Sequence, residues 1–284
     1  MSFATRFAPS PTGYLHRGHA FSALTTAQAA REAGGRFILR VEDIDRTRCR
    51  PEYETALLED LAWLGLDWER PVRRQSEHMD DYLAALDRLR GRGLVYRCFR
   101  TRREVAEAAS SAPHEAERAP FTSKGCDPGE EAELLAEGRP FAWRLSMSRA
   151  RAALGPAFDA LAFTEDGEGP GGESGRLPAR AERAGDIVLA RKDVGVAYHL
   201  AVVVDDALQA VSHVIRGQDL FEATGVQRLL QELLRLPEPV YRHHRLLTGP
   251  DGRRFAKRDR AETLREVRAA GVTPDQLRAE LGFA

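Results

Sequence analysis

The chain has 284 residues, of which 43% are hydrophobic and 30% charged, and its formal net charge is −1 at pH 7. This balance is typical of a globular protein, and the net charge by itself gives no sign of nucleic-acid binding. No apolar run approaches the ~20 residues that cross a bilayer, and the first residues lack the features of a secretory signal. Three cysteines are too few for a disulfide framework. We therefore expect a cytoplasmic protein with no membrane partner, and we take it to be a monomer.

The first part of the chain alternates predicted strands and helices. Strands are expected at residues 3–8 and 37–41, and helices at 16–32, 51–65 and 76–90. Pro51 fits the first turn of the second helix, and Ser76 is the expected N-cap of the third. This alternation predicts a doubly wound α/β fold.

The middle of the chain has a different character. Short strand-like stretches between residues 96 and 185 indicate an insertion, and the Gly-, Glu- and Pro-rich residues 165–178 are expected to form a loop. Strand-like apolar runs return at 186–190, 201–204 and 213–216, and a helix is expected at 222–235. Two short helices, beginning near 261 and 273, close the chain.

We therefore expect a catalytic domain in two halves, interrupted by an α+β insertion and followed by a short helical segment. The expected boundaries are 1–95 and 186–240 for the two halves, 96–185 for the insertion and 241–284 for the final segment.

The strongest functional signal is the segment from Arg6 to His19, Arg-Phe-Ala-Pro-Ser-Pro-Thr-Gly-Tyr-Leu-His-Arg-Gly-His. His16 and His19 lie three residues apart at a predicted helix start, so they share a face. A helix N-terminus offers N–H groups and a positive dipole end to a phosphate, and Gly18 lets a nucleotide approach the backbone. An isolated His-x-x-His pair is more often made of capping or surface histidines. The strand and the Pro-rich turn before it favour a nucleotide site here.

Lysine is scarce: only Lys124, Lys192 and Lys257 stand among 42 basic residues. A compact ammonium retained in an arginine-rich chain favours a charge-specific role. Lys257 follows the turn Pro250-Asp251-Gly252, within a basic run over 242–260. Such a run is most often a solvated surface.

These segments resemble the two signatures of class I aminoacyl-tRNA synthetases. The His16–His19 segment is similar to His-Ile-Gly-His in the form typical of the glutamyl branch, and Arg254-Phe255-Ala256-Lys257-Arg258 is similar to Lys-Met-Ser-Lys-Ser. The resemblance covers residues 5–260 and implies a Rossmann-type catalytic domain. It also implies that ATP binds as its Mg²⁺ complex at His16, Gly18, His19 and Lys257. In that family the lysine stabilises the α-phosphate during adenylation, so catalysis is assigned to His16, His19 and Lys257.

A glutamate pocket needs a cation for the side-chain carboxylate and an acidic partner for the ammonium. Arg6 and Arg216 are candidate cations near strand ends, Glu42 can meet the ammonium, and Tyr198 can supply a hydroxyl. Taken singly, each such residue is more often structural or solvated. The resemblance places the glutamate contacts at Arg6, Phe7, Ala8, Pro9, Ser10, Glu42, Tyr198 and Arg216.

A zinc site is not expected. Related enzymes often carry a metal knuckle in the insertion, but here Arg100 stands where a second cysteine would follow Cys98, and the downstream end offers only Cys126. Two thiolates do not fill a tetrahedral site, and His114 is expected to be an exposed loop residue.

The stretches 197–206 and 216–220 most resemble the short paralogues of glutamyl-tRNA synthetase, the glutamyl-Q tRNA(Asp) synthetase family. A chain of this length is expected to lack the long anticodon-binding region of the full synthetase. The implied activity is ATP-dependent activation of L-glutamate and its transfer to queuosine in the anticodon loop of tRNA(Asp). Two alternatives remain open: a truncated glutamyl-tRNA synthetase that charges a tRNA 3′ end, and a non-catalytic nucleotide- or RNA-binding module.

Overall fold

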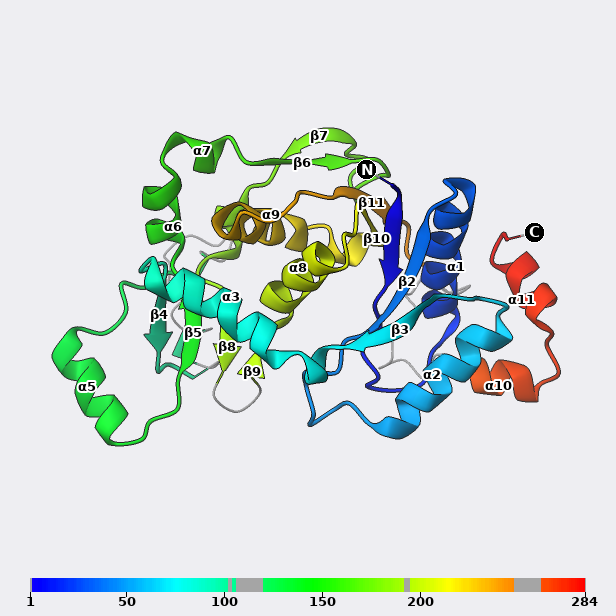
Figure 1. Ribbon diagram of the computed structural model, residues 1–284, viewed down its shortest axis with the longest axis horizontal. Coiled ribbons are helices and arrows are strands. Elements are labelled where there is room, and N and C mark those ends of the chain that lie inside the picture. The colour runs from blue at the N-terminus through cyan, green and yellow to red at the C-terminus, as the bar shows by residue number, and fades with distance from the viewer. Residues whose placement is uncertain (1, 102–103, 106–119, 192–194, 248–261, 284) are drawn as a thin grey trace.

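The computed structural model describes residues 2–101, 104–105, 120–191, 195–247 and 262–283. Its first part is a parallel three-stranded sheet in the order β1-β2-β3, with helices in the connections (Figure 1). The strands are β1 (Ala4–Phe7), β2 (Arg36–Val41) and β3 (Glu69–Arg74), and the helices are α1 (Arg17–Glu32), α2 (Pro51–Trp63) and α3 (Met79–Gly91). The predicted alternation of strands and helices is confirmed, and with it the α/β fold.

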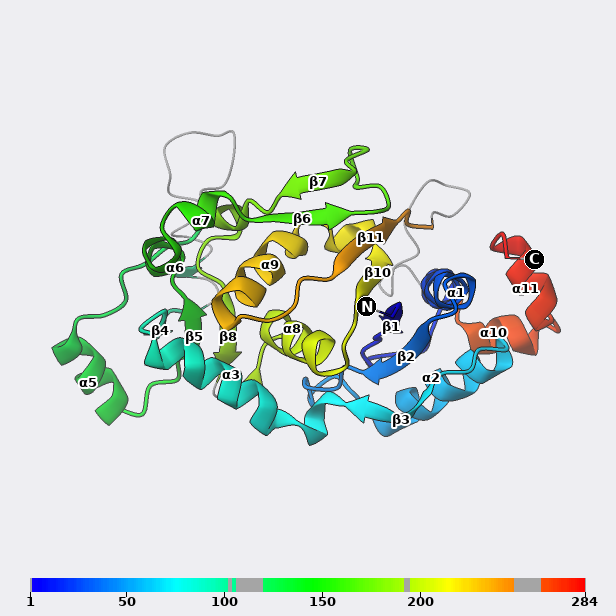
Figure 2. The same ribbon diagram turned by 45° about the horizontal axis from the view of Figure 1, so that its top comes forward.

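A second sheet continues from the first. Its order is β10-β11-β6-β7, with β10 and β11 parallel (Figure 2). These strands are β10 (His213–Gly217), β11 (Val240–His244), β6 (Ala162–Glu165) and β7 (Gly175–Pro178). Strand β10 lies beside β1, where the N–H of Ser212 donates to the carbonyl oxygen of Ala4 at 2.9 Å. The two sheets therefore meet at the first strand of the chain.

A third, antiparallel sheet lies at the far end of the molecule, in the order β4-β5-β8-β9 (Figure 1, left). Its strands are β4 (Val95–Cys98), β5 (Ala142–Leu145), β8 (Val188–Arg191) and β9 (Gly195–Val196). Helices α5 (Pro128–Ala136), α6 (Met147–Leu154) and α7 (Pro156–Asp159) accompany it. The run at 186–190 thus forms a strand, but one that belongs to this sheet.

The expected strand at 201–204 is wrong. These residues lie inside helix α8 (Tyr198–Leu208), which packs with α9 (Ala223–Leu234), the helix predicted near 222–235. Every residue of α8 from Leu200 to Asp206 is buried. A helix that is buried all round loses the 3.6-residue apolar period, so its sequence reads like a buried strand.

The expected loop at 165–178 is right for residues 166–174 and wrong at its two ends, which belong to strands β6 and β7. Strands β6 and β7 form a hairpin over this stretch, and the N–H of Gly169 donates to the carbonyl oxygen of Glu173 at 2.8 Å in its turn. Strand β6 pairs with β11, so the hairpin joins the second sheet. The domain boundaries at 95, 185 and 240 stay a prediction.

Ser76 does not cap the third helix. The helix begins at Met79, and both the N–H and the hydroxyl of Ser76 donate to the carboxylate of Asp43, at 2.8 and 2.5 Å. Asp43 follows β2, so a long-range acceptor competes successfully with the local cap.

The C-terminal helices are α10 (Leu264–Ala269) and α11 (Pro274–Glu280), each begun by a threonine in a capping box. Leu264, Val267 and Leu277 are buried in the apolar cluster that α1 and α2 also fill. The two helices are therefore part of the folded body. Among the helices within the described ranges, none is long and apolar enough to span a membrane.

The contact between α2 and α10 contains a buried acid. Asp60 is almost fully buried, its Oδ1 accepts one long hydrogen bond from Arg268 at 3.5 Å, and its Oδ2 has no partner among the described residues. Burial raises the pKa of Asp60 to about 6, although Arg268 opposes the shift. In an unfolded chain an aspartate has a pKa near ~4.

The folded state therefore binds more protons than the unfolded state between about pH 4 and pH 6, so the stability that Asp60 contributes is lost as the pH rises through 6. We expect Asp60→Asn to gain stability relative to the native protein as the pH rises from 4 to 7. Urea unfolding of both proteins at several pH values measures this difference. A difference that does not change with pH would contradict the buried, weakly paired state of Asp60.

Candidate active site

A cavity of about 600 Å³ opens where the carboxyl ends of β1, β2, β10 and β11 meet the start of α1. It is the place where an open α/β sheet binds its ligands. The cavity brings together all the predicted amino-acid and ATP contacts that lie among the described residues. They are Arg6, Phe7, Ala8, Pro9, Ser10, His16, Gly18, His19, Glu42, Tyr198 and Arg216. Lys257 lies outside the described residues.

The two histidines cap helix α1 together. His16 is the N-cap, and its Nδ1 accepts from the N–H of Gly18 at 3.1 Å, while Nδ1 of His19 accepts from the N–H of His16 at 3.1 Å. The ring centroids are 3.8 Å apart. Because each Nδ1 is an acceptor, the proton of each neutral ring is on Nε2. The cap therefore prepares both rings as hydrogen-bond donors at the end of a helix that attracts anions.

Gly18 is held closely by this arrangement. A Cβ atom at this position would lie 3.0 Å from Cε1 and 3.1 Å from Nδ1 of His16. A side chain would therefore push the His16 ring and disturb the bond that caps the helix. The glycine serves the ring geometry as well as access to the backbone.

Arg6 is paired within the protein. It is buried, and its Nε and Nη2 donate to the two carboxylate oxygens of Asp206 at 3.0 and 3.3 Å. Burial alone would raise the pKa of Asp206, but Arg6 and Arg40 lower it below its usual value. Arg6 lines the cavity with its charge already balanced.

Arg216 has no such balance. It is 4% exposed, and no ion pair within 4.0 Å joins it to a carboxylate in the parts of the chain that the structure describes. Its partners are neutral: His243 Nε2 at 3.1 Å, Gln227 Oε1 at 2.8 Å, Thr224 Oγ1 at 2.8 Å and the carbonyl oxygen of Leu220 at 3.1 Å. A buried guanidinium with only neutral partners favours an anionic ligand. Of the two candidate cations, Arg216 is the better fit to a substrate carboxylate.

Glu42 offers the opposite charge in the same cavity. It is 8% exposed, and its Oε1 accepts from Nη2 of Arg40 at 3.1 Å. Burial raises the pKa of Glu42 although Arg40 and Arg6 oppose the shift. An ammonium group in the cavity would add a second counter-charge to this carboxylate, beside that of Arg40. Tyr198, the first residue of α8, lines the cavity as well.

Sequence reasoning missed the residues that hold this site in place. Arg40 is fully buried and donates through Nη1 to Asp206 at 2.8 Å and to Gln209 at 3.0 Å, besides its bond to Glu42. The adjacent acids Asp205 and Asp206 in an apolar run were the available signal, since buried charges must be paired. Asp219, His244 and Arg245 also line the cavity, although the sequence gave them no role there.

The basic run at 242–260 is only partly a solvated surface. Arg242 is paired with Asp166, His243 is buried, and the guanidinium of Arg245 lies 4.9 Å from the ring centre of Phe21. Residues 248–260 of the run lie outside the described ranges.

The position of the predicted degenerate zinc site offers a poor donor set. Cys98 is buried and Cys126 is half-buried. The pKa of the Cys126 thiol is raised, mainly by burial and secondly by the nearby carboxylate of Glu130. The hydroxyl of Tyr96 donates to Asp186 at 2.8 Å. Within the described ranges no three His, Cys, Asp or Glu residues gather as metal ligands, and His114 lies outside them. These residues do not fit a tetrahedral zinc, and the expectation that none binds stays a prediction.

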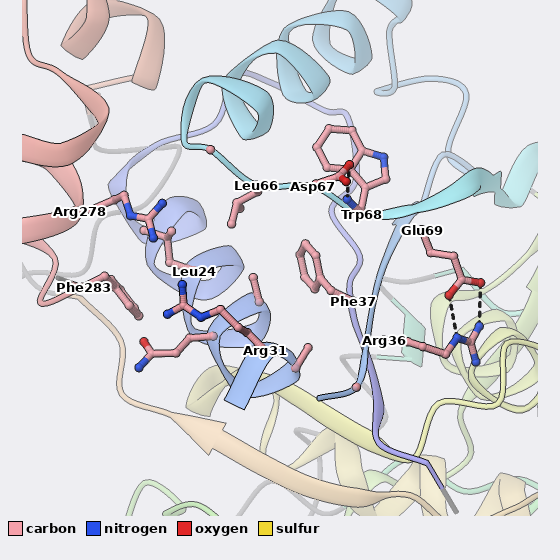
Figure 3. Close-up of a pocket in the computed structure, with 15 residues that line it drawn as sticks. Leu24, Arg31, Arg36, Phe37, Leu66, Asp67, Trp68, Glu69, Arg278 and Phe283 are labelled. Carbon is pink, nitrogen blue, oxygen red and sulfur yellow. Dashed lines mark hydrogen bonds and ion pairs between the residues drawn. The ribbon is translucent and has the colours of Figure 1, made fainter. Parts of the chain in front are cut away.

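A second cavity, of about 490 Å³, lies at the amino end of β2 (Figure 3). Leu24 and Arg31 of α1 face Leu66, Trp68 and the C-terminal residues Arg278 and Phe283 across it. Arg36 and Glu69 form a two-bond ion pair at its rim, at 2.7 and 2.8 Å. Of the predicted site residues that the structure describes, none lines this cavity.

We expect Arg40→Met to lower the free energy of unfolding by about 3–5 kcal/mol, because it leaves Asp206 and Glu42 buried without their shared cation. Urea unfolding at pH 7 measures this loss. Arg36→Met is a matched control on the same strand, and its exposed pair with Glu69 should cost at most about 1 kcal/mol. Equal losses of unfolding free energy in both variants would show that the buried ion pairs of Arg40 stabilise the fold no more than an exposed pair does.

Comparison with known proteins agrees with this geometry. The family model of class I tRNA synthetases (E and Q), catalytic domain, matches residues 2–282. The chain is 49% identical to a glutamyl-Q tRNA(Asp) synthetase of Rhodobacter capsulatus, covering 98% of this chain and 99% of that one. It is 41% identical to the protein of the same name from Symbiobacterium thermophilum, covering 98% and 85%.

Among solved structures, the glutamate-tRNA synthetase of Elizabethkingia anophelis aligns with a TM-score of 0.75 and 27% identity, covering 92% of this chain and 53% of that one. The Rossmann-like α/β fold inferred from the sequence is confirmed by this likeness. The chain belongs to the catalytic-domain family of the class I tRNA synthetases for E and Q.

Proposed function

We propose that this protein activates L-glutamate with ATP and transfers the glutamyl group to queuosine in the anticodon loop of tRNA(Asp). The observation that carries the proposal is the single cavity that joins an unbalanced buried cation, Arg216, to the acid Glu42 and to the helix start at His16 and His19. The 49% identity with a glutamyl-Q tRNA(Asp) synthetase, over nearly the whole of both chains, supports the acceptor.

Glutamate fits the charges of the cavity. Its side-chain carboxylate pairs with Arg216, its ammonium pairs with Glu42, and Tyr198 supplies a hydroxyl from the start of α8. The pairing with Arg216 supplies the counter-charge that this buried group lacks, and the pairing with Glu42 adds to the charge of Arg40.

ATP fits the start of α1. The Nε2–H groups of His16 and His19 donate to phosphate oxygens, and the helix dipole adds to their effect. The α-carboxylate of glutamate, already ionised at neutral pH, attacks the α-phosphorus and expels pyrophosphate with its Mg²⁺. Catalysis is then mainly positioning and neutralisation of charge, and it needs no nucleophilic side chain.

Lys257 completes the ATP site in this proposal. It lies in 248–261, outside the described residues, but the residues on both sides of that segment lie at the cavity. Leu246 and Leu247 line it, and Thr263 forms a β-bridge with His16. The ammonium would neutralise charge that develops on the α-phosphate.

Replacing Lys257 with alanine should raise the barrier to glutamate activation by roughly 3 kcal/mol, the loss expected for one transition-state charge contact. Glutamate-dependent exchange of pyrophosphate into ATP measures this change, and the binding of glutamate should change much less. Lys124→Ala is the matched control, because Lys124 is exposed and does not line the cavity. Unimpaired exchange in Lys257→Ala would remove this lysine from the mechanism.

The acceptor is tested by mapping where labelled glutamate attaches. We expect labelling of tRNA(Asp) only when it contains queuosine, because a splayed anticodon loop presents unstacked bases to a pocket. After nuclease cleavage the label should remain in the anticodon-stem fragment, and removal of the 3′-terminal adenosine should leave acceptance intact.

Two other outcomes would replace the proposal. Label on the 3′ adenosine of tRNA(Glu) would identify a truncated glutamyl-tRNA synthetase. An absence of both labelling and pyrophosphate exchange would identify a non-catalytic nucleotide- or RNA-binding module.

A further inference from the structure

We propose that Glu165 and His243 form a buried relay that sets the hydrogen-bonding state and orientation of Arg216, and so selects an amino acid with a side-chain carboxylate. The proposal rests on the proposed function, because it takes Arg216 as the group that binds this carboxylate. Glu165 and His243 act as positioning residues through Arg216.

Glu165, the last residue of β6, contacts His243 at two points. Its Oε2 lies 2.5 Å from Nδ1 of His243, and its Oε1 accepts from the backbone N–H of His243 at 2.8 Å. The same Oε1 accepts from the N–H of Gly167 at 2.9 Å. Both side chains of the pair are 0% exposed. The β6–β7 hairpin therefore delivers a fully buried carboxylate beneath the cavity.

This contact determines which nitrogen of His243 carries the proton. The carboxylate can only accept, so Nδ1 of the neutral ring donates to it and Nε2 keeps a lone pair. That lone pair accepts from Nε of Arg216 at 3.1 Å. Burial lowers the pKa of His243 below its usual value, although Glu165 opposes the shift. The lowered pKa favours the neutral ring that the bond to Arg216 requires.

The relay leaves Arg216 with little freedom. The guanidinium has five N–H groups, and bonds to His243, Gln227, Thr224 and Leu220 use four of them. The remaining N–H, on Nη1, has no partner among the residues that the structure describes, so it and the unbalanced charge are left for a ligand in the cavity. A guanidinium held at a fixed angle can discriminate a carboxylate from a neutral amide of the same shape.

The substitution Glu165→Gln tests the relay with almost no change of shape. The two backbone N–H groups require an acceptor at Oε1, so the new amide nitrogen replaces Oε2 and faces Nδ1 of His243. The ring must then accept at Nδ1 and carry its proton on Nε2, opposite the N–H of Arg216. Two donors face each other, and the bond that orients Arg216 is lost.

We expect Glu165→Gln to raise the KM for glutamate in pyrophosphate exchange by at least about tenfold, the loss typical of a hydrogen bond to a charged group. The KM for ATP should change less than about twofold, because the ATP contacts are made elsewhere in the cavity. The preference for glutamate over glutamine in kcat/KM should also fall by at least about tenfold. His243→Phe, which keeps a ring but has no acceptor, should give the same pattern.

Asp166→Asn is the matched control. It removes one negative charge from the neighbouring residue of the same hairpin, where the exposed Asp166 pairs with the half-buried Arg242. Its kinetics should match those of the native protein.

A spectroscopic measurement of the His243 tautomer tests the relay independently of enzyme activity. In protein labelled with ¹⁵N-histidine, the signals that disappear in His243→Phe identify His243. In the native protein they should report the Nδ1–H form, and in Glu165→Gln the Nε2–H form. A native His243 with its proton on Nε2 would overturn the relay, even if Glu165→Gln does not fold.

The two proposals fail in different ways. If the native protein activates glutamate and both relay variants keep its KM for glutamate, the proposed function stands and the relay is overturned. If the native protein does not activate glutamate, the proposed function fails, and the selection of a carboxylate by Arg216 fails with it.

Discussion

The site depends first on one buried guanidinium, that of Arg40. Arg40 is the second-to-last residue of β2. Its guanidinium contacts Asp206 of α8 and also Glu42, which follows the same strand. Burial opposes its charge, but Asp206, Glu42 and Asp205 together raise its pKa above the usual value. One cation thus links the first sheet to the helix that begins at Tyr198. Without it, Glu42 would lose the cation that it contacts, and Asp206 would keep only its pair with Arg6.

This network explains why two arginines in one cavity differ. Arg6 shares Asp206 with Arg40, so the positive charge of Arg6 is balanced by a carboxylate of the protein itself. Arg216 comes from β10, on the other side of the junction between the two sheets, and is held by neutral groups. The cavity is therefore anionic at Glu42 and cationic at Arg216. An amino acid with a carboxylate in its side chain can place its ammonium group at Glu42 and its side-chain carboxylate at Arg216.

Much of the fold followed from local signals, because a helix start is a local event. Pro51 and Thr273 begin helices as predicted, since a first-turn proline or a capping threonine acts within four residues. The helix over Ala201–Val204 was not predicted, because burial on every side removes the apolar period that distinguishes a helix from a strand. Eleven of the residues that line the site were predicted, by their place at strand ends and by family resemblance. The contacts that hold them were not, because Glu165 and His243 are 78 positions apart and neither lies in a recognisable motif.

The residues that hold Arg216 in place lie on different strands, and this has a consequence for how the amino-acid preference can change. Glu165, His243 and Arg216 come from β6, β11 and β10, and each satisfies the next. Replacing Arg216 alone leaves an imidazole without its donor, and replacing Glu165 alone reverses the ring. A single substitution in this set therefore weakens the preference for glutamate and leaves a neighbouring polar group without its partner. A fully paired site with another preference would need substitutions on more than one strand, so these three residues are expected to change together.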